Sequence, residues 1–62
     1  MFKIKYETPE KTGWLHTEYY SPEDADQIAK QLVAGGRGDI LRTTVIEQAG
    51  HVYSQWQTNL IR

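Results

Sequence analysis

The sequence predicts an α+β domain with the element order ββαββ, in which one helix packs on one face of a four-stranded antiparallel sheet. Three observations indicate this class. Residues 2–7 alternate between apolar and charged side chains, a central segment carries apolar residues at helical spacing, and two strand-like segments flank a Gly-containing turn near the C-terminus. At 62 residues, the chain is expected to form one small domain, residues 1–62.

Two strands and a loop are predicted before the helix. Phe2, Ile4 and Tyr6 alternate with charged residues, and this period of two is typical of a half-buried strand. Residues 8–13 are polar and include a proline and a glycine, which favours a hairpin loop. Residues 14–20 (WLHTEYY) are rich in aromatic side chains and predict the second strand.

The next segment carries the start signals of a helix. Ser21 is predicted to cap its N-terminus through the side-chain hydroxyl, and Pro22 suits the first helical position. Carboxylates near this end complement the helix dipole: Glu23, Asp24 and Asp26. Apolar residues at helical spacing form one stripe: Ala25, Ile28, Ala29, Leu32 and Val33. The helix is expected to end at Gly35 or Gly36, where a left-handed residue is easily accommodated.

The C-terminal part predicts a loop and a second hairpin. Residues 35–39 (GGRGD) are interpreted as a connection, and residues 40–48 (ILRTTVIEQ) as the third strand. A turn at residues 49–50 leads to the fourth strand, from residue 51 to about residue 58 (HVYSQWQT). Residues 59–62 either extend this strand or fray.

A right-handed crossover through the helix places the third strand beside the first, which gives the antiparallel order 2-1-3-4. Alternation along the strands then assigns the face under the helix to Phe2, Ile4, Tyr6, Leu15, Tyr19, Leu41, Val45, Val52 and Trp56. It assigns the open face to Lys3, Lys5, His16, Glu18, Arg42, Thr44, Ile46, Tyr53, Gln55 and Gln57. Trp14 and Tyr20 share the open-face parity, although Tyr20 alternatively folds over Ala25 as a hydrophobic staple.

Composition argues against several functional classes. The chain has 7 Lys and Arg against 8 Asp and Glu, whereas proteins that bind nucleic acid through its phosphates usually have a basic excess. It has no cysteine, so thiolate nucleophiles and Cys-based metal sites are excluded. The sequence has neither an apolar run of membrane-spanning length nor the apolar core of a signal peptide, which predicts a cytoplasmic protein.

No residue pattern indicates catalysis, a metal site or a cofactor. His16 and His51 are isolated, and zinc sites need three or four ligands. Ser21 is accounted for by the helix cap, and Ser54 lacks the strained turn that exposes a nucleophile. The GGRGD segment follows a helix and lacks the Gly-Lys-Ser/Thr of a phosphate-binding loop. We therefore predict that the chain is not an enzyme.

The aromatic rings are interpreted first as core and structural residues, and the surplus rings as candidates for binding. Seven rings in 62 residues exceed what a core of this size needs, and exposed Trp and Tyr beside Arg are typical of protein interfaces. Aromatic rings are also the platforms on which single-stranded nucleic acid stacks. Candidate partner-binding residues are Lys3, Lys5, Trp14, His16, Arg37, Arg42 and Tyr53.

The layout of hairpin, Ser-Pro-Glu-Asp-Ala helix start, Gly connection and Gly-turn hairpin resembles that of small phage-encoded inhibitor proteins, including some anti-CRISPR proteins and a phage inhibitor of bacterial RNA polymerase. The resemblance spans most of the chain as a pattern, and it is carried by residues 21–25, Ile28, Ala29, Leu32, Leu41 and Val45. These residues are structural, so the resemblance transfers no functional residue. It implies an inhibitor of a larger host or defence protein.

The leading hypothesis is thus a non-enzymatic module that binds a larger protein. The alternatives are a nucleic-acid-binding protein that uses Lys3, Lys5, Arg42 and Tyr53 on the open sheet face, and a homodimer. Two copies would pair through sheet edges or open faces, since an uncovered edge can pair with its own copy.

Overall fold

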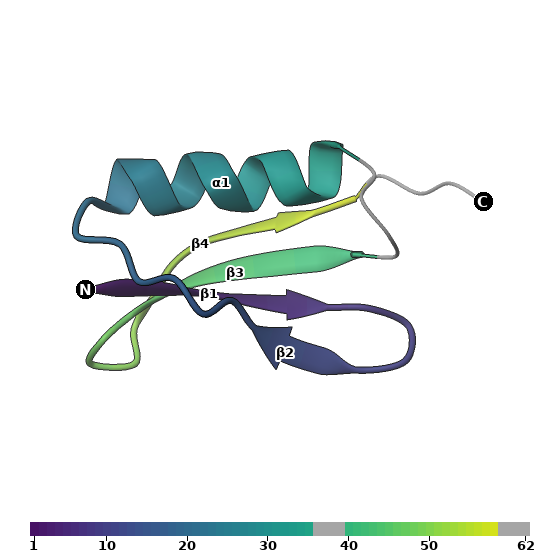
Figure 1. Ribbon diagram of the computed structural model, residues 1–62, viewed down its shortest axis with the longest axis horizontal. Coiled ribbons are helices and arrows are strands. Elements are labelled where there is room, and N and C mark those ends of the chain that lie inside the picture. Colours follow the sequence, from purple (N-terminus) through teal and green to yellow (C-terminus); the bar gives the residue numbers. More distant parts are fainter. Residues whose placement is uncertain (36–39, 59–62) are drawn as a thin grey trace.

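The computed structural model describes residues 1–35 and 40–58, and it confirms the predicted fold class and strand order. One antiparallel sheet has the order β2-β1-β3-β4, and α1 (Pro22–Ala34) lies on one side of it (Figure 1). The strands are β1 (Phe2–Glu7), β2 (Thr12–Trp14), β3 (Arg42–Glu47) and β4 (Val52–Gln57). The predicted third and fourth strands are each one to two residues too long at their ends.

The core lies where α1 crosses the central strands. Ala25 and Ala29 of α1 are fully buried together with Ile4 of β1 and Val45 of β3. Alanine has the smallest side chain that still presents an apolar surface, so the helix backbone lies close to the sheet. The hydroxyl of Thr43 on β3 uses this proximity and donates a hydrogen bond of 2.9 Å to the carbonyl of Ala29. The predicted apolar stripe of the helix is confirmed.

Both predicted helix ends need correction in their details. The Ser21 hydroxyl does not cap a backbone N–H; it donates to the carboxylate of Glu23 at 2.8 Å. Gly35 ends the helix with φ −75°, in the right-handed region, and Gly36 lies outside the described residues. Tyr20 is 86% exposed and forms no hydrophobic staple over Ala25, because its ring extends into solvent.

The second strand is shorter than predicted and begins earlier. Gly13, predicted in the loop, lies in β2 opposite Tyr6, and a Cβ at Gly13 would come within 3.0 Å of the Tyr6 side chain. After Leu15 the chain leaves the ladder, and it returns only at Tyr19, which pairs with Phe2 through hydrogen bonds of 2.7 and 2.9 Å. The excursion adds two residues relative to β1, which preserves the alternation, and Leu15 and Tyr19 both pack against the core as predicted.

A β-bulge changes the faces of β4. Val45 pairs with Ser54, but Ile46 pairs with Val52, so Tyr53 is an extra residue without a partner in the ladder. Val52 was predicted under the helix; it lies opposite Ile46 on the other face and is 62% exposed. Tyr53 was predicted on the open face, but its ring lies edge-on to Phe2, which packs against the core under α1, with centroids 5.7 Å apart.

The turn before β4 depends on one glycine. The Gly50 N–H donates to the Glu47 carbonyl at 2.7 Å, and Gly50 has φ 101°, which L-residues with a side chain rarely adopt. No helix in residues 1–35 and 40–58 has the length and apolar character needed to cross a membrane.

Candidate binding surfaces

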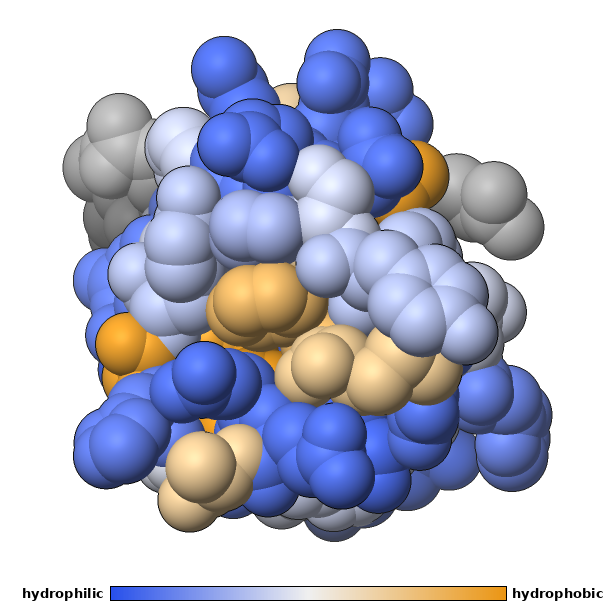
Figure 2. All heavy atoms as spheres, turned by 90° about the vertical axis from the view of Figure 1, so that its left-hand side faces the viewer, coloured by the Kyte–Doolittle hydropathy of each residue, from blue (hydrophilic) through white to orange (hydrophobic). Residues whose placement is uncertain are grey.

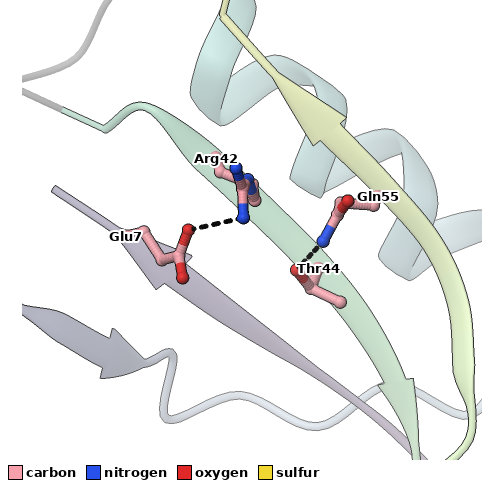
Figure 3. A network of polar contacts seen from close by, with 4 residues as sticks. All are labelled: Glu7, Arg42, Thr44 and Gln55. Carbon is pink, nitrogen blue, oxygen red and sulfur yellow. Dashed lines mark hydrogen bonds and ion pairs between the residues drawn. The ribbon is translucent and has the colours of Figure 1, made fainter.

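The predicted cations of the open face lie on that face, and two of the three are paired. The Arg42 guanidinium is 3.2 Å from the Glu7 carboxylate, and the Lys3 ammonium is 3.5 Å from Glu18. Figure 3 shows the Glu7–Arg42 pair on the side of the sheet turned away from the helix. These pairs bring carboxylates to the positions where phosphates would have to bind, so the face offers little net positive charge.

The middle of the open face is also covered by its own side chains. Thr44 points away from α1 but is only 8% exposed, and its hydroxyl accepts a hydrogen bond of 3.2 Å from the Gln55 side-chain amide (Figure 3). The Nε atom of Arg42 is buried and has no hydrogen-bond partner among the described residues. Side chains of the sheet itself therefore shield Thr44, whereas the Arg42 Nε donor stays unsatisfied.

Trp14 and His16 lie at the β2 edge of the sheet. Trp14 is 49% exposed, and the Lys5 ammonium lies 6.0 Å from its ring centroid. A shallow hollow of about 320 Å³ is lined by Lys3, Trp14, His16 and Glu18 together with Leu15. The structure therefore groups Lys3, Lys5, Trp14 and His16, whereas Arg42 lines a separate hollow and Arg37 lies outside the described residues.

A second polar centre, absent from the sequence prediction, joins α1 to β4. The Oδ1 atom of Asp26 accepts hydrogen bonds from the Ser54 hydroxyl at 2.5 Å and from the Trp56 indole N–H at 2.8 Å. These two bonds, with a smaller contribution from the charge of Lys30, hold the pKa of Asp26 below its ordinary value despite some desolvation. Asp26 is therefore ionised at neutral pH and fixed in orientation.

The same residues line a groove between the helix and the edge strand, here named the α1–β4 groove. Its first part, of about 370 Å³, is lined by Glu23, Asp26, Gln27, Lys30, Tyr53 and Trp56. Its second part, of about 390 Å³, shares Lys30 and Trp56 and adds Val33, Ala34, Gln57 and Thr58. The groove runs along β4 on the side of the sheet that carries the helix.

Apolar surface gathers at the end of the molecule next to the first part of the groove. Figure 2 shows this end, with a small apolar area that is bordered above by residues of intermediate hydropathy and below by hydrophilic ones. Tyr53, whose ring contacts that of Phe2, is 49% exposed, and Met1, the neighbour of Phe2 in the sequence, is 37% exposed. The Tyr53 ring, which the sequence predicts on the open face, is therefore exposed on the helix side of the sheet.

A hollow of about 500 Å³ beside the β1–β2 loop is lined by both Glu7 and Arg42, whose charges already compensate each other. In the described part of the chain, no three His, Cys, Asp or Glu side chains are grouped as a metal site would require.

The sequence signal for the α1–β4 groove was weak. Asp26 was assigned to the helix dipole, and nothing in its spacing indicates a contact with residues 28 and 30 positions later. No protein-family model, curated protein or solved structure matches the chain.

Proposed function

We propose that this chain is a non-enzymatic module that binds a larger protein, and that it does so by accepting an extended segment of the partner along the outer edge of β4. The observation that carries the proposal is the composition of this edge. β4 has six residues, VYSQWQ, without a charge, a proline or a glycine. Edge strands that avoid pairing usually contain charges, a proline or a β-bulge, are very short or are covered. Of these devices β4 has only the bulge at Tyr53, and residues 54–57 beyond it pair regularly with β3.

The opposite edge of the sheet is different. β2 has three residues and contains Gly13, and the chain leaves the ladder after Leu15. A strand this short offers too few backbone groups to hold a partner. The two edges therefore differ in the way expected if only β4 serves for recognition.

The ladder fixes which backbone groups of β4 are available. The N–H of Thr58 donates to the carbonyl of Leu41 at 2.8 Å, so this is a hydrogen-bonded pair of the antiparallel ladder. Since such pairs alternate, the N–H and C=O groups of Gln55 and Gln57 point away from β3. In the described residues, no strand pairs with them on that side. An added strand would satisfy them, which is the established mode of recognition by β-strand addition.

The open face gives less support to nucleic-acid binding, because Lys3 and Arg42 are paired with carboxylates. Binding through phosphates would first have to displace both carboxylates. We propose further that the chain inhibits its partner by occupying a surface that the partner uses.

The test compares Gln55→Pro with Gln55→Ala. Proline removes the outward N–H of an edge strand without breaking its ladder, whereas alanine removes only the side chain. Tagged proteins would be incubated with lysate of the source cells, and bound protein quantified after nuclease treatment. We expect one stoichiometric partner to be captured by wild type and Gln55→Ala and lost in Gln55→Pro, with circular dichroism showing that all three fold.

A partner retained by folded Gln55→Pro would contradict strand addition at β4. Recovery of nuclease-sensitive material released by salt would favour the nucleic-acid alternative instead. A mass that doubles with concentration for wild type and not for Gln55→Pro would identify the partner strand as β4 of a second copy.

A further inference from the structure

We infer that the α1–β4 groove selects a partner segment carrying a basic side chain, preferably arginine, two positions from an apolar one. This inference rests on the proposed strand addition at β4 and specifies the chemistry of the segment that is added. A strand paired with the outer edge of β4 would direct alternate side chains to the helix side of the sheet. These side chains would enter the groove between β4 and α1.

The first part of the groove suits a guanidinium group. It presents the carboxylates of Glu23 and Asp26, against one cation, Lys30. The Lys30 ammonium is directed to the Trp56 ring, 5.3 Å from its centroid. A planar guanidinium can bind a carboxylate through two hydrogen bonds and stack on a half-exposed ring such as Tyr53.

Asp26 is well prepared for such a contact. Its Oδ1 atom is held by Ser54 and Trp56, and Oδ2 accepts no hydrogen bond from any described residue. The carboxylate is therefore oriented before a ligand arrives, which reduces the entropy lost on binding. Glu23 accepts one hydrogen bond from Ser21, which also restrains its position.

The second part of the groove suits an apolar side chain. It is lined by Val33 and Ala34 and by the ring of Trp56. Because both parts share Lys30 and Trp56, they are neighbours along β4. Side chains on one face of a strand repeat about every 7 Å, so residues i and i+2 of one segment would fill both parts.

A second copy of the chain fits this groove less well than a basic foreign segment. In an antiparallel β4–β4 pair, the side chains entering the groove would come from VYSQWQ, which carries no positive charge. The two carboxylates in the first part would then meet no complementary group. Charge complementarity thus favours a basic partner.

The experiment is a selection from a displayed library of random 12-residue peptides, with the folded 62-residue chain as bait. We expect enriched peptides to contain Arg or Lys two positions from a large apolar residue. Two variants test the origin of the preference. Glu23→Gln with Asp26→Asn should abolish the enrichment of basic residues, whereas Asp24→Asn, which changes a carboxylate outside the groove lining, should retain it.

The outcomes separate the two proposals. Peptides whose binding is lost in Gln55→Pro bind through β4. If such peptides lack basic residues, the inference is overturned and strand addition at β4 still stands. Basic peptides that bind equally to the Glu23→Gln and Asp26→Asn double variant would also overturn it. If the library yields no peptide sensitive to Gln55→Pro, the proposed function itself fails.

Discussion

The indole N–H of Trp56 donates to Asp26 Oδ1 at 2.8 Å, and this bond joins two residues that are 30 positions apart. The bond connects the first half of α1 to the outermost strand. Without it, the helix would be held mainly over the central strands, through Ala25, Ala29 and Thr43. The same bond orients the carboxylate in the α1–β4 groove. The stability of the fold and the proposed recognition therefore both involve the Asp26 side chain, and the effect on stability can be measured.

Asp26→Asn should lower the free energy of unfolding at pH 7 by about 1 kcal/mol, because hydrogen bonds to a charged acceptor become bonds to a neutral one. The folded-state pKa of Asp26 lies below 3.8, so its contribution is present above that pH and is lost as the pH falls through the folded-state pKa. The difference between wild type and variant should shrink accordingly in urea titrations from pH 7 to pH 2.

Asp24→Asn is the control for this pH series. Asp24 lies in the first turn of the same helix and is exposed, so its replacement changes the charge by the same amount. A pH-dependent loss of equal size in both variants would show that the helix dipole, and not the contact with β4, accounts for the effect of Asp26.

Thr43→Val should destabilise the fold by about 1 kcal/mol, because the variant keeps the shape of the buried side chain and removes its hydrogen bond to Ala29. Thr44→Val is the matched control on the opposite face, where the bond to Gln55 is only partly buried. Chemical denaturation of both variants measures the difference. A larger loss for Thr44→Val would contradict the importance given to the helix–sheet bond.

Ala29→Leu should destabilise by about 1–3 kcal/mol or prevent folding, because a larger side chain would force α1 away from Ile4 and Val45. Ala34→Leu adds the same atoms at an exposed position near the helix end and should change stability by less than about 0.5 kcal/mol. Thermal melting followed by circular dichroism distinguishes them. Equal melting temperatures for the two variants would show that the core accommodates the extra volume.

Gly13→Ala should destabilise the β1–β2 hairpin, because the added methyl group would meet the Tyr6 ring. A double-mutant cycle tests the cause: in a Tyr6→Ala background, the same substitution should cost less, with a coupling energy of about 0.5–3 kcal/mol. Additive effects would instead indicate that the backbone at Gly13 is responsible.

The sequence predicts the central strands well because their alternation is uninterrupted. Ile4 and Val45 point to the helix, and Lys5 and Thr44 lie opposite each other on the other face. The strand order also follows, since the handedness of a crossover is a general rule. The predicted faces depend on local alternation and the predicted strand order on chirality. Both predictions can be made without knowing any individual contact.

The errors occur where pairing, and not local pattern, decides the geometry. Alternation assigns Val52 and Tyr53 to faces opposite to those observed, because the bulge depends on how β4 meets β3. The Ser21 hydroxyl has a nearby carboxylate as a competing acceptor, which propensity does not take into account. The α1–β4 groove could not be predicted for the same reason, since Asp26 and Trp56 meet only when the helix is docked.

The extra residue in β4 also bears on how this chain could change over evolutionary time. Because Tyr53 has no partner in the ladder, Val52 and Ser54 already pair with adjacent residues of β3. Deleting one codon there would leave all other strand pairs in register and remove one aromatic ring from the groove. A binding surface in such a fold can thus be gained or lost by a change in chain length, without passing through a rearranged sheet.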